Sequence, residues 1–362
     1  MKRKASLYIY LLLTCIIMII SGPTIYSQDS SRTSNTTING LVDVYFSKNL
    51  SGPANRINKY RNFDVTENQF NVSLAKLTIQ KQASPIGFKL DFAYGPTADI
   101  VQSAEPNKSL NFLQQALITV ILPIGKGLTV NAGKMVTHMG AEVIESISNP
   151  NYSRSLLFAY AVPYYHVGIC AAYPILDNLS ITGYVYNGWN IMQDNNKYKT
   201  LGATLSWTPV SNLTIIENWI GGVEQPDSIS TNARHVFDTI VNLTVSDKVS
   251  LFFNTDYGFE KQPNGDQAVW KGVAVIGKYS FCETSALALR GEVYSDPYGF
   301  TTGTIQDLKE ITLTYEQKFL SNLLVRLEYR RDWSNVKVFD DGSNAGTRTD
   351  QNTLLISSVV SF

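Results

Sequence analysis

The chain has 362 residues, with 30 Lys and Arg against 30 Asp and Glu, and 44% of its residues are hydrophobic. This balanced charge, without a basic tract, gives no sign of nucleic-acid binding, and beyond the N-terminal segment no run of about 18 apolar residues argues for a helical membrane protein. A mean hydropathy of -0.06 is compatible with a soluble protein, but also with a membrane barrel, whose strands alternate lipid-facing and lumen-facing residues.

The N-terminus has the order of a secretory signal peptide. Three basic residues at positions 2–4 precede an apolar run over residues 7–20. A run of about 14 residues is short for a membrane-anchoring helix, so a cleaved signal is the better interpretation. We therefore expect residues 1–27 to be removed and residues 28–362 to form a single domain.

Segments that alternate apolar with small or polar residues follow one another to the C-terminus, as in half-buried β-strands. Leu90 and Phe92, for example, flank Asp91 on one of these segments. The strands that we predict, in chain order, are 36–46, 69–81, 86–95, 113–122, 127–135, 164–173, 178–187, 200–208, 213–221, 234–245, 249–259, 268–281, 285–295, 308–319, 322–333 and 352–362.

The connections alternate between tight turns and longer polar loops. Pro123, Pro174 and Pro209 are placed in three of the tight turns, because proline suits a reversal where no ladder donor is needed. This asymmetry, together with 20 Tyr, 16 Phe and 5 Trp, predicts an all-β fold, a transmembrane up-and-down antiparallel β-barrel of about sixteen strands, with short periplasmic turns and long extracellular loops. Fourteen or eighteen strands stay open, and a soluble β-sandwich is the alternative. A barrel this wide leaves an aqueous channel.

Charged residues occupy strand positions that should face the barrel interior. A Lys or Arg facing lipid near the membrane midplane costs roughly 2–4 kcal/mol, so charges in strand register indicate a wet lumen. The strand residues that we expect to line it are Lys89, Asp91, His166, Arg234, Asp238, Arg290, Glu292, Arg326, Glu328 and Arg330. For any single one of them, the alternative is a residue that only solvates or braces the wall.

The longest loop, over residues 136–163, is unusual because its later part, residues 156–162, is apolar. An exposed loop should be polar, so we expect this one to fold against the inner wall and narrow the pore. The residues that would form the constriction, facing Arg326 and Arg330 of the wall, are His138, Glu142, Glu145 and Arg154. The alternative is that the apolar segment extends a strand or contacts a neighbouring subunit.

Several segments resemble a known family. They are NKYRNFD at 58–64, GPTAD at 95–99, GKMVTHMGAE at 133–142, YSRSLLF at 152–158 and GFTTG at 299–303. They resemble the OmpL-like β-barrel porin family of Gram-negative bacteria, over roughly residues 39–362. The resemblance implies an outer-membrane porin and carries no catalytic residues. Phe362 also resembles the C-terminal signal that is read by the outer-membrane insertion machinery.

We therefore predict a porin in the outer membrane of a Gram-negative bacterium, for passive diffusion of small hydrophilic solutes. The alternative is a substrate-specific channel, or a surface receptor or adhesin with little general conductance. We expect no enzyme activity, cofactor or metal, because Gly-x-Ser-x-Gly and H-E-x-x-H motifs are absent; His138, His166 and His235 are predicted to be hydrogen-bonding residues of the lumen. Besides solutes, the expected partners are outer-membrane lipid, the insertion machinery and further copies of the chain, since the apolar strand segment 169–172 suits a homotrimer contact.

Overall fold

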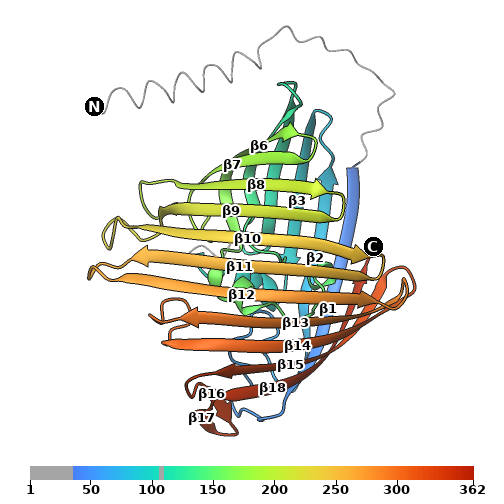
Figure 1. The fold of residues 1–362 in the computed structure, drawn as a ribbon, viewed down its shortest axis with the longest axis vertical. Helices are drawn as coiled ribbons and strands as arrows, with labels where there is room; N and C mark the ends of the chain where they lie inside the picture. Colours follow the sequence, from blue (N-terminus) through green and yellow to red (C-terminus); the bar gives the residue numbers. More distant parts are fainter. Residues whose placement is uncertain (1–35, 106–109) are drawn as a thin grey trace. The chain divides into compact units, whose positions relative to one another are not determined.

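The computed structural model describes residues 36–105 and 110–362, so the predicted signal peptide lies outside the described residues. The described chain forms a closed barrel of sixteen antiparallel strands, in which each strand pairs with its neighbours in sequence and the first and last strands close the ring (Figure 1). The prediction of a sixteen-stranded up-and-down barrel is confirmed.

The barrel strands are β1 (Thr36–Asn49), β2 (Gln69–Lys81), β3 (Ile86–Tyr94), β4 (Leu113–Leu122), β5 (Leu128–Val136), β6 (Tyr165–Leu176), β7 (Leu179–Tyr186), β8 (Thr200–Val210), β9 (Leu213–Val223), β10 (Ala233–Ser246), β11 (Val249–Lys261), β12 (Gln267–Ser280), β13 (Ser285–Asp296), β14 (Gln306–Phe319), β15 (Leu323–Ser334) and β18 (Asp350–Ser361). A separate hairpin, β16 (Phe339–Asp341) with β17 (Asn344–Arg348), lies in the last long loop. The short helical segments are α2 (Pro96–Val101), η2 (Ser146–Ser148) and η3 (Leu157–Ala161). None of the described helices has the length and apolar composition needed to cross a membrane.

The two ends of the barrel chain meet on the tight-turn side. Gly40 of β1 and Phe362 exchange backbone N–H to carbonyl hydrogen bonds of 3.0 Å each. Two predicted turns are shorter than expected, because Pro174 and Pro209 lie inside β6 and β8. The pairing shifts register beside both prolines, which have no N–H to donate to the ladder. Proline here ends regular pairing and does not form the turn itself.

Side chains alternate between the two faces of the wall, as the pleat of a strand requires. On β14, Ile311 and Leu313 are exposed on the outer face, whereas Glu310 and Thr312 are buried on the inner face. β2 departs from this alternation at Ser73, where two of its residues lie opposite one residue of β1, which is the geometry of a β-bulge. The bulge changes the phase of β2 for the rest of the strand.

Candidate functional site

Residues 137–164, which join β5 to β6, are named the inner loop. Leu156, Leu157 and Ala161 of this loop are buried and belong to the same hydrophobic cluster as Trp270 of β12 and Tyr294 of β13. Trp270 also donates its indole N–H to the carbonyl of Ala161 at 3.2 Å. The apolar part of the loop is therefore the π-helical turn η3, packed on the inner wall, and not a strand extension.

Carboxylates of the wall accept hydrogen bonds from backbone N–H groups of the inner loop. Glu328 of β15 accepts from Tyr152 at 2.7 Å and from Ser153 at 3.1 Å. Glu292 of β13 accepts from Leu156 and Leu157, each at 2.7 Å. Buried backbone donors need partners, and a charged acceptor makes the bond stronger than a neutral one. These two strands hold the loop by its main chain.

Three arginines of the wall complete the attachment. Arg290 of β13, which is buried, donates to Glu142 at 2.8 Å and to the carbonyl of Ser153 at 2.7 Å. Its Nε pairs with Glu310 of the neighbouring strand at 2.7 Å. Arg290 thus pairs with two carboxylates, Glu142 of the loop and Glu310 of the wall. Each of these buried charges therefore has a partner of opposite sign.

Arg326 and Arg330 lie against the inner loop, but they bind its backbone carbonyls and not its carboxylates. Arg326 donates to the backbone carbonyls of Ser146 and Asn149 at 2.6 and 2.7 Å, and Arg330 donates to the carbonyl of Arg154 at 2.6 Å. Both guanidinium groups are buried under the loop, not exposed to the lumen. A planar guanidinium carries five donors, and here they satisfy carbonyls that an irregular loop leaves without partners.

The opposite side of the inner loop is held by β1, β2 and β4. Glu145 forms an ion pair with Lys76 and accepts from Gln114 at 2.8 Å, while Asp43 accepts from the Tyr152 hydroxyl at 3.0 Å. Burial opposes ionisation of Glu145, but the Lys76 ammonium and these hydrogen bonds outweigh it and lower the pKa of this carboxyl group. These strands follow β15 and β18 around the ring, so the attachment of the loop extends along the wall from β13 to β4.

The beginning of the inner loop is anchored at Gly140, whose φ of +86° lies in the region that favours glycine. Its N–H donates to Asp238 of β10 at 2.8 Å, and the N–H of Ala141 donates to Asn254 of β11 at 3.1 Å. Asp238 was predicted to line the lumen, and it lies on the inner face, where it is buried beneath this turn.

Two of the three histidines lie inside the barrel, against tyrosine rings. His138 stacks on Tyr184 and His166 on Tyr186, with ring centroids 4.1 Å apart in both pairs. Burial lowers the pKa of His138 to about 4, so this loop residue is neutral near pH 7. His235 is different: it lies on the outer face of β10, at the same phase as the exposed Phe237, and contacts the aromatic rings there. The prediction that it hydrogen-bonds in the lumen is wrong.

The remaining predicted residues have local partners. Arg154 donates to backbone carbonyls of its own loop, including Val143 at 3.0 Å, so it braces the loop and does not project into the lumen. Lys89 and Asp91 lie together on the inner face of β3, 3.5 Å apart. Arg234 pairs with Glu260 of β11 at 2.6 Å.

Sequence reasoning missed Lys76, Asp43 and Tyr152. The inner position of Asp43 follows from the alternation of β1 and could have been found. Lys76 was not assigned to the inner face, where it lies because the one-residue insertion at Ser73 moves every later side chain of β2 to the other face. No cluster of three or more His, Cys, Asp or Glu suited to a metal ion occurs in the part of the chain that the structure describes.

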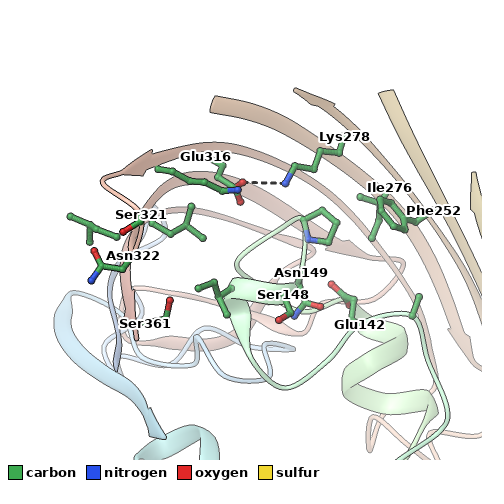
Figure 2. A pocket seen from close by; sticks show the side chains of 16 residues that line it. Glu142, Ser148, Asn149, Phe252, Ile276, Lys278, Glu316, Ser321, Asn322 and Ser361 are labelled. Atoms are coloured by element: carbon green, nitrogen blue, oxygen red, sulfur yellow. Dashed lines mark hydrogen bonds and ion pairs between the residues drawn. The ribbon is translucent and has the colours of Figure 1, made fainter. Parts of the chain in front are cut away.

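Two cavities lie on the two sides of the inner loop. The larger one, of about 420 Å³, lies toward the tight turns, between residues 141–150 of the loop and the strands that carry Lys278, Glu316 and Lys318. Figure 2 shows the ion pair of Lys278 with Glu316 at its edge, across from Ser148 and Asn149 of the loop. The second, of about 200 Å³, is lined by residues from 159–164 of the loop and by Trp189, Arg234 and Phe300, among others.

The chain was compared with known proteins. A family model described as "Putative beta-barrel porin-2, OmpL-like" matches residues 35–362, whereas no curated protein sequence matches the chain. Three solved structures are similar to the barrel: an anion-selective porin from Comamonas acidovorans (10% identity, TM-score 0.65, 90% of this chain and 99% of that one), OmpF from Salmonella typhi in complex with daunomycin (11%, 0.62, 90% and 97%), and a trimer form of OmpT from Vibrio cholerae (13%, 0.61, 90% and 99%). At such low identity, these structures show a shared fold alone.

Proposed function

The chain belongs to the OmpL-like β-barrel porin-2 family of the outer membrane, and from that premise we propose that it is a channel for passive diffusion of small hydrophilic solutes, with the inner loop as its constriction. The family and the fold are those of a channel, and the proposed transport needs no chemistry from the protein. Solutes move down their gradient through the lumen of a barrel that is too wide for wall side chains to fill.

The observation that carries this proposal is the attachment of the inner loop to both sides of the wall. Lys76 of β2 binds Glu145 on one side, and Asp238 of β10, on the facing side of the ring, binds the N–H of Gly140. A segment held in this way occupies the cross-section between the two cavities and sets the size of what passes. His138, Glu142 and Arg154 belong to this segment, so we propose them as constriction residues through their positions in the loop.

Conductance in a planar lipid bilayer tests the channel, and a loop deletion tests the constriction. Replacing residues 143–160 by a short Gly-Ser linker is expected to raise single-channel conductance several-fold, because it removes the segment between the cavities. Replacing residues 263–266, the exposed connection between β11 and β12, by a Gly-Ser linker is the control and should leave conductance unchanged. Heat-modifiable migration in gel electrophoresis verifies that both variants still form barrels. Absence of stepwise conductance in the unmodified protein would contradict the channel.

A milder pair of substitutions tests the loop without removing it. Glu142→Gln combined with Glu145→Gln is expected to change conductance and ion selectivity, because it takes away the loop charges that face Arg290 and Lys76. Unchanged conductance and selectivity would show that these residues are not part of the constriction.

A second candidate is a substrate-specific channel, or a receptor barrel with little general conductance. It is favoured by the extent of the loop's attachment, since a loop fixed by several buried charges leaves a narrow passage. Liposome swelling separates the two: uptake that falls smoothly with solute size supports general diffusion, and uptake of one solute class supports a specific channel.

We also propose a homotrimer, since the similar OmpT structure is described in a trimer form. Ile169 and Ala171 of β6 and Gly183 of β7 lie on the outer face and make a flat, apolar surface where a second copy could pack closely. Native electrophoresis without heating reports the state, and Ala171→Lys is expected to give monomers. Two further proposals are cleavage of residues 1–27 as a signal and recognition of Phe362 by the insertion machinery.

A further inference from the structure

Ion pairs at the two cavities share one feature: the basic partner is accessible to solvent and the acidic partner is buried. In the larger cavity, Lys278 keeps 27% of its side-chain surface exposed, while its partner Glu316 keeps 7%. Glu316 also forms an ion pair of 2.7 Å with the guanidinium of Arg326. One carboxylate thus faces two cations, and an excess of positive charge remains on the side that solvent reaches.

Lys318 adds to this excess. It occupies the next inner-face position of β14 after Glu316, is exposed, and lines the same cavity. The other acidic residue of the cavity lining, Glu142, is neutralised by Arg290 at 2.8 Å and is buried. The charges that a solute meets in this cavity are therefore those of two lysines.

In the smaller cavity the basic partner is again the more accessible one, although Arg234 also lies near a second carboxylate, Glu224. Arg234 lines it with 16% of its side chain exposed, and its partner Glu260 has 2%. The Arg234 guanidinium lies over the rings of Trp189 and Phe300, 4.9 and 5.2 Å from their centroids. Two aromatic faces fix its position at the cavity, so it cannot fold away from an entering solute.

The buried carboxylates do not cancel the positive charge that a solute meets at the two cavities. Glu292, Glu328 and Asp238 each accept backbone N–H bonds from the inner loop, and these donors lie between the carboxylates and the lumen. Charges that are screened by solvent act mainly over the Debye length of about 8–10 Å, so the exposed groups nearest the solute dominate. Electrostatic complementarity of this kind raises the local concentration of the opposite ion.

We propose that the channel prefers anionic solutes, with Lys278 and Lys318 setting the preference in the larger cavity and Arg234 in the smaller one. The proposal rests on the proposed channel function and names the charge class of its solutes. Small carboxylates and phosphates are the expected kind of cargo, and small cations are disfavoured at both cavities.

The reversal potential of the full-length protein in a planar bilayer under a KCl gradient tests the proposal. A permeability ratio of chloride to potassium above 1 is expected. Lys278→Gln combined with Lys318→Gln should lower that ratio by about threefold, the size expected for removing unit charges several ångströms from the ion path in water. A matched control exists on the same strands: Lys271→Gln with Lys309→Gln changes exposed outer-face lysines and should leave the ratio unchanged.

Each result has a defined meaning. A ratio at or below 1 in the unmodified protein overturns the anion preference while leaving the channel standing. An unchanged ratio in the Lys278 and Lys318 variant, with barrel formation verified by heat-modifiable migration, overturns the assignment to these residues. Absence of any conductance overturns the proposed function itself, and with it this inference.

Discussion

The inner wall of the barrel has two arcs of different chemistry. Inner-face positions of β4 to β9 carry uncharged side chains that are bonded across strands, such as Thr119 to Asn131 and Thr204 to Asn218. The arc formed by β10 to β15 and β1 to β3 carries the charges, and Arg290 and Arg326 on it are buried under the inner loop. We refer to these as the neutral arc and the charged arc.

A charged side chain at an inner-face position of a strand is therefore not necessarily exposed to water. The charged arc holds the loop, so its groups are mostly satisfied by loop backbone and by one another. The neutral arc keeps partial contact with solvent and needs no ionic partner. The ionic attachments of the loop therefore come mainly from one arc, while Gln114 of β4 and Tyr184 of β7 add uncharged contacts from the other.

The largest effect is expected at the centre of the charged arc. Arg290→Met removes the partner of Glu142 and Glu310, and breaking a buried ion pair by removing one side costs about 3–5 kcal/mol. Denaturant-induced unfolding, followed by heat-modifiable migration, measures it. Thr204→Val on the neutral arc is the control, and an equal loss in both variants would contradict the division into arcs.

A smaller loss is expected at Glu328, which accepts hydrogen bonds from loop backbone and from the Thr314 hydroxyl at 2.7 Å. Glu328→Gln removes the charge that accepts from Tyr152 and Ser153, and a hydrogen bond to a charged group contributes about 1.5–3 kcal/mol. Hydrogen exchange of the Tyr152 and Ser153 amides should accelerate while strand amides stay protected. Unchanged exchange at these two amides would show that the carboxylate does not hold the loop.

The neutral arc should respond weakly and locally. Thr119→Val removes the hydroxyl that donates to Asn131 at 2.7 Å, a neutral bond worth about 0.5–1.5 kcal/mol. The inner loop is not attached through Thr119 or Asn131, so hydrogen exchange of the Tyr152 amide should not change. Faster exchange of the loop amides in this variant would mean that the two arcs are coupled.

The smallest effect is a pH dependence of the Glu145 attachment. Because the folded-state pKa of Glu145 is lowered, its contribution is fully present above the ordinary glutamate pKa of about 4.3 and is lost as the pH falls through the lower folded-state value. Loop amide exchange, measured between neutral and acidic pH and corrected for its intrinsic pH dependence, should show this loss. Glu145→Gln should show a smaller pH dependence, and an identical profile in both proteins would exclude Glu145 as the titrating group.

The fold was predictable because β-strand alternation is a local property. Sixteen segments were identified, most with ends within a few residues, since a period of two is visible in any short window. Some strands extend past their predicted ends with irregular pairing, as β6 does beyond Pro174. The bulge at Ser73 moves Lys76 to the inner face; the alternation of residues 69–81 changes phase near residues 74–77, so the sequence indicated a bulge there but not the role of Lys76.

The candidate site was predictable in part. The length and apolar character of the loop indicated that it folds inward, and strand phase placed Arg290, Arg326 and Glu328 on the inner face. The partners were not predictable: Arg326 binds loop carbonyls, and Glu145 pairs with Lys76. His235 was misplaced although the alternation that puts Arg234 and Asp238 of the same strand on the inner face puts His235 on the outer one.

The sequence predicted about sixteen strands, most of their faces and the existence of an unusual loop, because each of these depends on patterns within about ten to thirty residues. The tertiary structure alone decided which charges hold the loop and which remain open to solvent. Arg290 and Glu142, for instance, are far apart in the chain and 2.8 Å apart in space. Closure of the barrel creates that proximity, and a local sequence pattern carries no information about it.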